Sequence, residues 1–323
     1  MKIVFHGDNA ANFREGFEDI LGEDHEIITL RDRIESAGDQ AAFAAADVII
    51  GVKLSKDDPQ PRALRLYQAP AAGTDAIDPT CLPPSAVLCN AFGHEHAIAE
   101  YVMAVLLTRH VPLARADERL RAGHWDFWAG RPGALRTELG AQSIGLLGFG
   151  HIGKAIAMRA KAFGMRVSVC NRSAIPTDHL VNESYTLEAI NRFMGSADVI
   201  VVSLPLLAET RGIVDAPALA AMRRDAIIVN VGRGPVIDET ALFDALSRKS
   251  IGGAAIDTWY QYPSPDKPEA LPSALPFHTL PNLVMTPHMS GWTNGTVRRR
   301  QETVAENIRR LRRGLSLLNT IRR

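Results

Sequence analysis

The stretch "GLLGFGHIGKAIAMRAKAFGMRVSVCNRS", residues 145–173, decides the fold of this chain. Gly148, Gly150 and Gly153 have G-x-G-x-x-G spacing, an apolar strand precedes them, and a helix that ends near Gly164 follows. A second apolar strand comes roughly 20 residues later, as in a dinucleotide-binding β-α-β unit. There the first glycine allows a tight turn, the second admits a pyrophosphate, and the third lets the helix pack on the strand. The alternative is a glycine turn that serves packing alone.

The end of that second strand departs from the usual pattern. An acid normally accepts hydrogen bonds from the ribose hydroxyls there, but this chain has Asn171, Arg172 and Ser173. Asparagine removes the negative charge, and arginine supplies a fork of donors suited to a phosphate. The three residues favour NADP over NAD, although NAD remains possible if Arg172 only points into solvent.

Short apolar segments alternate with alanine-rich or polar ones on both sides of this stretch. Expected strands lie at 46–52, 65–70 and 85–90 before it, and at 197–205, 226–232 and 251–259 after it. A long helix is expected over 96–110. This alternation predicts an α/β fold with doubly wound parallel sheets. Functional side chains should then follow the strand ends, where the loops converge.

Composition and charge exclude several classes of protein. The chain has 323 residues, 46% of them hydrophobic, so two globular domains are expected. Lys+Arg and Asp+Glu total 36 each, so the net charge gives no reason to expect binding to nucleic acid or to an anionic membrane. Its three cysteines lack metal or redox spacing, so no metal site is expected. No targeting or bilayer-spanning segment is visible. These features predict a cytoplasmic protein.

Three polar residues follow expected strands in the second half of the chain. They are Arg233 in "NVGRGPVIDE", Asp257 in "AAIDTW" and His288 in "TPHMSGW". Beside a nicotinamide, an arginine orients a carboxylate and polarises a carbonyl, and a histidine moves a proton near neutral pH. Each residue alone could be structural, but their joint position predicts reduction of a carbonyl or its reversal.

These motifs together resemble the D-isomer-specific 2-hydroxyacid dehydrogenase family, which also contains formate, phosphite and phosphoglycerate dehydrogenases. The markers are "GLLGFGHIGKAIA", "VSLPLLAETRGIV", "NVGRGPVIDETAL", "GAAIDTW" and "LPNLVMTPHMSG", in the family's order. The resemblance implies two Rossmann-like domains, with a cofactor domain (98–288) inserted into a split substrate domain (1–97 and 289–323). It also implies a homodimer, and a small 2-oxo or 2-hydroxy acid such as glyoxylate or hydroxypyruvate as the substrate.

The resemblance assigns roles by position. It implies that Arg233 binds substrate, His288 is the acid/base, Asp257 lies near the nicotinamide, and the backbone of Ala72 and Gly73 cradles a carboxylate. The cofactor contacts that it implies are Gly148, Gly150, His151, Ile152, Gly153, Asn171, Arg172, Ser173, Pro205, Thr210, Val231, Gly232 and Asp257.

Two positions depart from the family pattern. The catalytic glutamate normally lies five residues after the aspartate, where this chain has Tyr262, and an asparagine common in the family is replaced by His94. Asp266 or Glu269 could supply the missing carboxylate. The altered pocket leaves open a dehydrogenase for an atypical small substrate. A further alternative is a non-catalytic, NAD(H)-sensing protein that resembles the family's corepressors.

Two further segments are conspicuous. Trp125, Phe127 and Trp128 fall in an expected loop; packing is the favoured interpretation, and an active-site or dimer contact is the alternative. Nine arginines lie between 298 and 323, where Val304, Ile308, Leu311 and Leu315 form an apolar stripe. The arginines are therefore expected on the solvated face of a helix that returns to the first domain.

Overall fold

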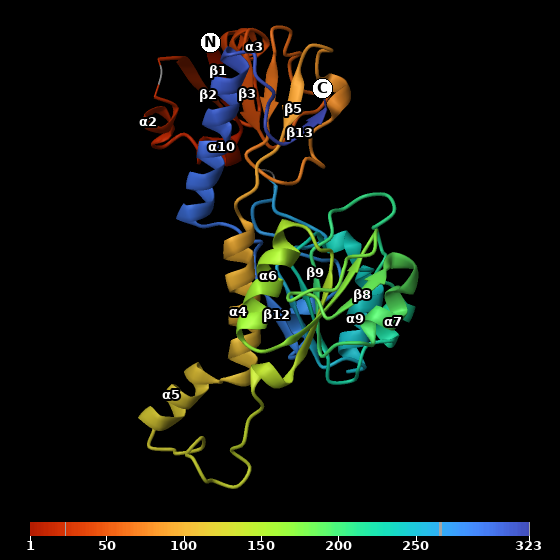
Figure 1. Cartoon of the computed structure of the whole chain (residues 1–323). Helices are drawn as coiled ribbons and strands as arrows, with labels where there is room; N and C mark the ends of the chain where they lie inside the picture. Colours follow the sequence, from red (N-terminus) through yellow and green to blue (C-terminus); the bar gives the residue numbers. More distant parts are fainter. Residues whose placement is uncertain (23, 265–266, 323) are drawn as a thin grey trace. The chain divides into compact units, whose positions relative to one another are not determined.

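The computed structural model describes residues 1–22, 24–264 and 267–322, coloured along the chain in Figure 1. The chain divides into two compact units. Unit 1 comprises Met1–His94 and Trp292–Arg323, and unit 2 comprises Glu95–Gly291. The boundaries expected from the sequence, at 97/98 and 288/289, lie a few residues from these positions.

Unit 2 is built on a seven-stranded sheet in the order β8-β7-β6-β9-β10-β11-β12, and every pair is parallel. The order reverses between β6 and β9, as in a doubly wound dinucleotide-binding sheet. Strands β9 and β10 are buried along their whole length, because apolar layers cover both faces. The strands are β6 (Ser143–Leu147), β7 (Arg166–Asn171), β8 (Glu183–Thr186), β9 (Val199–Val202), β10 (Ile227–Asn230), β11 (Gly253–Ile256) and β12 (Leu283–Met285).

The helices of unit 2 begin and end where local chemistry favours it. Gly164, with φ of 79°, follows the last turn of α6, a conformation that glycine adopts without strain. The side chain of Asp238 accepts a hydrogen bond from Ala241 N at 2.8 Å and so caps α9. The helices are α4 (Glu95–His110), α5 (Leu113–Arg121), α6 (His151–Ala162), α7 (Ile190–Met194), α8 (Ala216–Ala220) and α9 (Glu239–Ser247).

Unit 1 contains a second sheet, in the order β13-β5-β4-β3-β1-β2. The expected α/β class is confirmed for both units, but the sheet of unit 1 is not wholly parallel, because β13 runs antiparallel to β5. An antiparallel edge strand is common on an otherwise parallel sheet. Its elements are β1 (Lys2–His6), α1 (Asp8–Ala11), α2 (Phe17–Leu21), β2 (Glu26–Leu30), α3 (Ala37–Ala44), β3 (Val48–Gly51), β4 (Leu66–Gln68), β5 (Val87–Cys89), α10 (Asn294–Arg312) and β13 (Thr320–Arg322).

Helix α10 packs into the core of unit 1. Val304 and Ile308 are buried in the same apolar cluster as β1 and α2. The expected stripe was wrong at Leu315, which is exposed, because the helix ends at Arg312. The solvated-face interpretation was also wrong for Arg300, which is 9% exposed.

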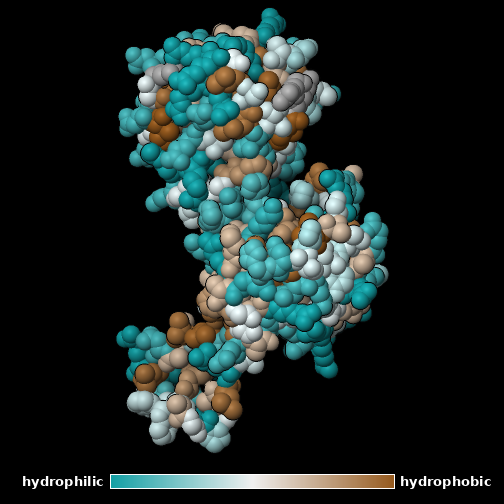
Figure 2. All heavy atoms as spheres, in the orientation of Figure 1, coloured by the Kyte–Doolittle hydropathy of each residue, from teal (hydrophilic) through white to brown (hydrophobic). Residues whose placement is uncertain are grey.

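Helix α5 and the loop after it form an arm, defined here as residues 113–138. The arm extends away from the rest of unit 2 (Figure 1). Packing was the favoured interpretation for its aromatic residues, and it was wrong: Trp125 is 61% exposed and Trp128 is 64% exposed. Figure 2 shows brown, hydrophobic side chains over this arm.

Among the described residues, no single helix is long and apolar enough to cross a membrane. Helices α4 and α5 would meet the length and hydropathy requirement only as a pair, and the chain bends by 46° between them.

Candidate functional site

The glycine turn after β6 has the geometry of a phosphate-binding turn. Gly148 has φ of 101°, and a Cβ on Gly153 would lie 2.3 Å from the carbonyl oxygen of Gly148, so the helix approaches the strand as closely as glycine permits. A Cβ on Gly150 would meet no described atom within 4 Å. Helix α6 then starts with His151 and Ile152, and no described side chain caps it. The open space and the helix N-terminus fit a pyrophosphate.

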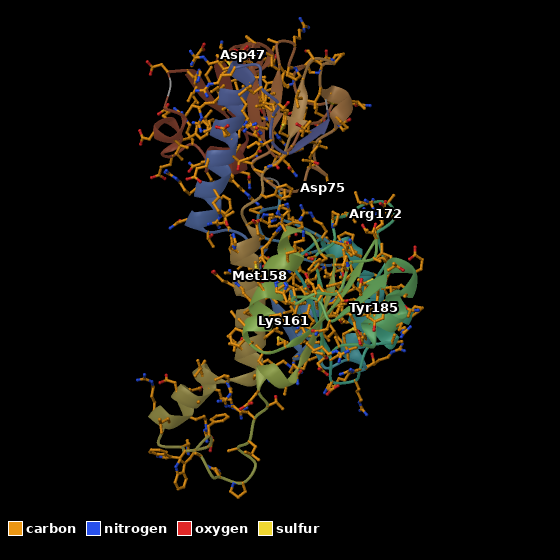
Figure 3. All side chains as sticks on the ribbon, viewed as in Figure 1. Asp47, Asp75, Met158, Lys161, Arg172 and Tyr185 are labelled. Atoms are coloured by element: carbon orange, nitrogen blue, oxygen red, sulfur yellow. The ribbon has the colours of Figure 1, made fainter. Side chains whose placement is uncertain are left out.

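Asn171, Arg172 and Ser173 lie at the end of β7, as expected. Asn171 is half-buried, and Arg172 and Ser173 are exposed. Arg172 lies at the surface of unit 2 (Figure 3) and forms no hydrogen bond or ion pair with any residue that the structure describes. Its guanidinium is therefore available to a ligand.

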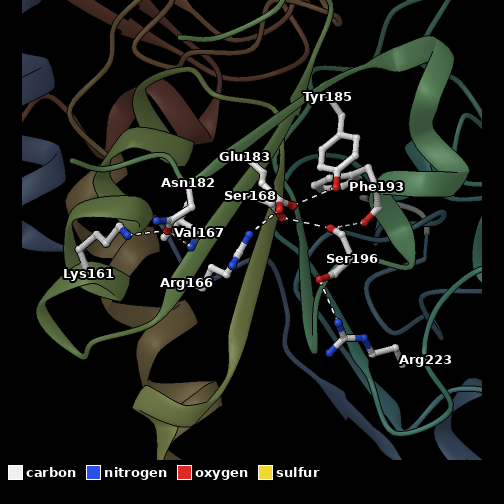
Figure 4. A network of polar contacts seen from close by, with 10 residues as sticks. All are labelled: Lys161, Arg166, Val167, Ser168, Asn182, Glu183, Tyr185, Phe193, Ser196 and Arg223. Atoms are coloured by element: carbon white, nitrogen blue, oxygen red, sulfur yellow. Dashed lines mark hydrogen bonds and ion pairs between the residues drawn. The ribbon is translucent and has the colours of Figure 1, made fainter. Parts of the chain in front are cut away.

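A polar network holds the edge of the sheet that carries these residues (Figure 4). Asn182 Oδ1 accepts hydrogen bonds from Val167 N at 2.9 Å and from Lys161 Nζ at 2.6 Å. Arg166 of β7 pairs with Glu183 of β8, and Tyr185 donates to the other oxygen of Glu183 at 3.0 Å. The network holds β7 against β8 and so supports the strand that Arg172 directly follows.

The turns after β9 and β10 lie against each other. Thr210 Oγ1 donates to the carbonyl of Pro205 at 2.7 Å, which closes the turn after β9. Val231 N donates to the carbonyl of Val202 at 3.1 Å, and a Cβ on Gly232 would lie 2.7 Å from the carbonyl oxygen of Leu204. Four expected cofactor residues (Pro205, Thr210, Val231 and Gly232) therefore follow adjacent strands.

Arg233 stands on a loop shaped by the buried side chain of Asn230. This amide accepts a hydrogen bond from Gly232 N and donates one to the carbonyl of Arg233, both at 3.1 Å. The guanidinium is half-buried, and its Nη1 donates to the carbonyl of Gly232 at 3.0 Å. A Cβ on Gly234 would lie 2.4 Å from the carbonyl oxygen of Trp259, so this loop packs on the loop after β11. Sequence reasoning missed Asn230, whose position inside an apolar strand was the available signal.

Asp257, at the end of β11, has 0% exposure. Its Oδ1 accepts hydrogen bonds from Thr286 Oγ1 at 2.6 Å and Met289 N at 2.9 Å, and its Oδ2 accepts one from Ser290 N at 3.0 Å. Between these donors lies His288, with φ of 58°. The carboxylate therefore shapes the loop that carries the histidine.

The imidazole of His288 meets Tyr262, the residue that stands where the resemblance predicts a glutamate. Tyr262 Oη lies 3.0 Å from His288 Nδ1, and it accepts a hydrogen bond from Trp259 N at 3.0 Å. Trp259 also donates from Nε1 to the carbonyl of Thr286 at 2.8 Å. Both Tyr262 and His288 are exposed. Sequence analysis did not identify Trp259 as a residue of this site. A single tryptophan after a strand does not indicate that its backbone N–H and its indole N–H donate to two different groups.

The two carboxylates considered as substitutes for the family glutamate gain no support. Glu269 is exposed and forms no hydrogen bond with any residue that the structure describes. Asp266 lies outside the described residues.

In unit 1, the expected substrate residues also follow strands. Ala72 and Gly73 come after β4, and His94 comes after β5; all three are half-buried. Asn90 Nδ2 donates to the carbonyl of Ala72 at 2.8 Å and so fixes the loop after β4. Among the described residues of both units, no group of three or more His, Cys, Asp or Glu side chains is placed to hold a metal ion.

Comparisons with known proteins agree on one family. Residues 102–290 match the model of the D-isomer specific 2-hydroxyacid dehydrogenase, NAD binding domain. The chain is 33% identical to a D-3-phosphoglycerate dehydrogenase of Methanocaldococcus jannaschii, over 83% of this chain and 50% of that protein. It therefore spans about half the length of that relative.

Two further proteins are similar over most of their length. A glyoxylate/hydroxypyruvate reductase B of Pectobacterium carotovorum is 31% identical, over 85% of this chain and 84% of that protein. A solved D-isomer specific 2-hydroxyacid dehydrogenase from Xanthobacter autotrophicus, in complex with NADPH and MES, superposes with a TM-score of 0.77 and 25% identity, over 99% of this chain and 98% of that one.

Proposed function

The chain belongs to the D-isomer specific 2-hydroxyacid dehydrogenase family, and we propose that it reduces a small 2-oxo acid with NADPH or runs the reverse reaction. The observation that carries this proposal is the arrangement of one sheet edge. Arg233 follows β10 and His288 follows β12, on either side of β11, and the glycine turn follows β6 of the same parallel sheet. Glyoxylate and hydroxypyruvate are the first substrates to test, because relatives are named for them.

In this proposal unit 2 is the cofactor domain. When bound, the nicotinamide supplies or accepts the hydride. The open space beside Gly150 and the start of α6, which no described side chain caps, support a pyrophosphate there, with Gly148, Gly153, His151 and Ile152 forming the turn. Pro205, Thr210, Val231 and Gly232 form the adjoining wall. Asn171, Arg172 and Ser173 face the adenosine ribose, and a guanidinium that pairs with no described residue supports a preference for NADP.

Each catalytic role follows from the chemistry of one side chain. Arg233 binds the substrate carboxylate with two donors and polarises its carbonyl. His288 gives a proton to the developing alkoxide in reduction and removes one in oxidation. Asp257 holds the loop of His288, and Tyr262 holds its Nδ1. For unit 1, the proposed substrate domain, we assign carboxylate binding to the backbone of Ala72 and Gly73 and substrate selection to His94. Within unit 2, we assign a substrate contact to Tyr262.

A homodimer is part of the proposal. The exposed apolar side chains of the arm, including Trp125, Trp128 and Leu135, support a second copy of this chain as their partner, since exposed apolar patches commonly mark protein–protein interfaces. A cytoplasmic location is also proposed. The free thiols of Cys81, Cys89 and Cys170 support it, because thiols persist in a reducing compartment.

The proposal is tested by a spectrophotometric screen of 2-oxo acids with NADPH and with NADH. We expect turnover of at least one small 2-oxo acid, with NADPH preferred. Cofactor binding without turnover of any acid would favour a nucleotide-sensing binding protein. Turnover confined to an unrelated small carbonyl compound would favour the atypical-substrate alternative.

A further inference from the structure

A hydrogen-bond chain runs from helix α4 to the loop that carries His288. Tyr101 Oη lies 2.8 Å from Thr286 Oγ1, and Thr286 Oγ1 lies 2.6 Å from Asp257 Oδ1. Tyr101 and Thr286 are 185 residues apart in sequence. Tyr101 lies outside every motif that predicted the site, and Thr286 lies within one of them but had no role there.

The direction of the two hydrogen bonds follows from the number of protons. A carboxylate only accepts hydrogen bonds, so the hydroxyl of Thr286 gives its single proton to Asp257. Thr286 Oγ1 then has only lone pairs for Tyr101, and Tyr101 must be the donor. Burial raises the pKa of Tyr101, and the charge of Asp257 adds to this rise. The phenol therefore keeps the proton that it donates.

The last hydrogen bonds of this series join Asp257 to the backbone on the carboxyl side of His288. Asp257 accepts hydrogen bonds from Met289 N and Ser290 N, the two residues that follow His288. His288 itself has φ of 58°, a left-handed conformation that costs a non-glycine residue free energy and persists only when its surroundings hold it. Since Asp257 is buried, water cannot replace a missing donor at its carboxylate without entering the core. The orientation of Asp257 therefore decides the backbone of His288.

We propose that Tyr101 and Thr286 are positioning residues for His288: Tyr101 orients Thr286, Thr286 orients Asp257, and Asp257 holds the loop of the histidine. This inference rests on the proposed function for the role of His288, but the hydrogen-bond chain does not depend on the substrate. Tyr101 acts from α4 and contributes to catalysis through two intermediate side chains.

The proposal is tested by a double-mutant cycle on turnover. Tyr101→Phe should lower kcat by roughly threefold to tenfold, the effect of one hydrogen bond, and should leave the KM for NADPH unchanged. Thr286→Val should lower kcat further, and Thr286→Ser should restore most of it. Adding Tyr101→Phe to Thr286→Val should cause no additional loss, because the acceptor is already gone. An equal loss from Tyr101→Phe in both backgrounds would overturn the proposal, as would a parallel change in the KM for NADPH.

A matched control and a second readout separate this inference from the proposed function. Thr108→Val removes a hydroxyl from the exposed side of the same helix α4, where it bonds the carbonyl of Ala104, and should leave kcat unchanged. Hydrogen exchange of the Met289 and Ser290 amides needs no substrate. It should accelerate in Tyr101→Phe and Thr286→Val and stay at the wild-type rate in Thr108→Val. Unchanged hydrogen exchange in the first two variants would overturn the positioning role of Tyr101 and Thr286. A failed substrate screen would overturn only the proposed function.

Discussion

The hydroxyl of Tyr262 lies 3.0 Å from Nδ1 of His288, and Tyr262 stands at the position where the resemblance predicts a glutamate. The same hydroxyl accepts the N–H of Trp259, so the phenol's own proton can be donated to Nδ1. A neutral phenol thus lies beside the histidine that we propose as the acid/base, at the position where the resemblance predicts a charged carboxylate.

The first prediction concerns the charge beside His288. A carboxylate within hydrogen-bonding reach stabilises an imidazolium, so Tyr262→Glu should raise the pKa of His288 above that of the wild type. Reduction needs the protonated ring, so its fall with rising pH should move to higher pH. Oxidation needs the neutral ring, so its rise should move to higher pH too. The measurement is kcat/KM against pH in both directions.

Tyr262→Phe is the matched control, because it removes the hydroxyl without adding charge. It should lower activity, and the pH at which kcat/KM for reduction falls should not move upward. If the limb also stays in place in a folded, NADPH-binding Tyr262→Glu protein, Tyr262 is not the partner of His288.

The second prediction concerns Arg172 and the 2′-phosphate. Arg172→Ala should raise the KM for NADPH by about 10-fold to 150-fold, which corresponds to roughly 1.5–3 kcal/mol for a hydrogen bond to a charged group. Use of NADH should barely change. Arg248→Ala, which removes an exposed arginine of an i,i+4 pair with Asp244, serves as the control. A wild-type preference for NADH would rule out this role.

The third prediction concerns Arg233. Arg233→Ala should lose kcat/KM while NADPH still binds, as measured by quenching of intrinsic fluorescence. Arg233→Lys should recover little activity, because an ammonium group cannot hold a carboxylate with two parallel hydrogen bonds. Near-normal turnover of the lysine variant would exclude bidentate binding by Arg233.

The fourth prediction concerns stability and His6 in unit 1. Burial lowers the pKa of His6 below 6.5, although Asp58, at 3.8 Å, and Asp32 oppose this change and Lys53 adds to it. The unfolded chain therefore binds a proton more readily than the folded one. The contribution of His6 to the free energy of unfolding is therefore fully present above about pH 6.5. It is lost as the pH drops toward the lowered pKa of the folded protein, and the free energy of unfolding then falls by at most about 1.4 kcal/mol per pH unit.

His6→Gln should remove this dependence. Urea denaturation at pH 7.5 and 5.5 should show a smaller stability difference in the variant than in the wild type. His110→Gln provides a comparison, because burial, followed by the charge of Arg109, lowers the pKa of that histidine as well. An identical pH dependence in His6→Gln and the wild type would contradict the prediction.

The fifth prediction concerns the arm. If a second copy covers it, the double variant Trp125→Ser/Trp128→Ser should shift the protein from dimer to monomer in light scattering after size exclusion. The variant should still bind NADPH, because the arm lies apart from the glycine turn in sequence. A wild-type monomer at micromolar concentration would refute the assignment.

Local rules predicted some parts of this molecule and not others. The glycine turn was predictable, because three glycines at fixed spacing between a strand and a helix have few other uses. The half-buried β8 strand, ESYT, was missed, since it lacks an apolar run. The exposure of Trp128 was misjudged, because sequence gives no direction for a loop that leaves the domain. The contact between Tyr101 and Thr286 joins distant positions, and no local pattern encodes it.

The division of unit 1 has a consequence during protein synthesis. Its core needs α10, whose Val304 and Ile308 pack with Phe5 and Phe17, and the sheet needs β13 at its edge. Those segments leave the ribosome only after residues 95–291 have been made, which takes about 10 to 40 s at typical elongation rates. For that interval the inserted unit can fold, while the nascent amino-terminal part keeps its aromatic residues uncovered. Translation speed and chaperone supply should therefore govern the yield of native protein more strongly than they would for a chain with two consecutive domains.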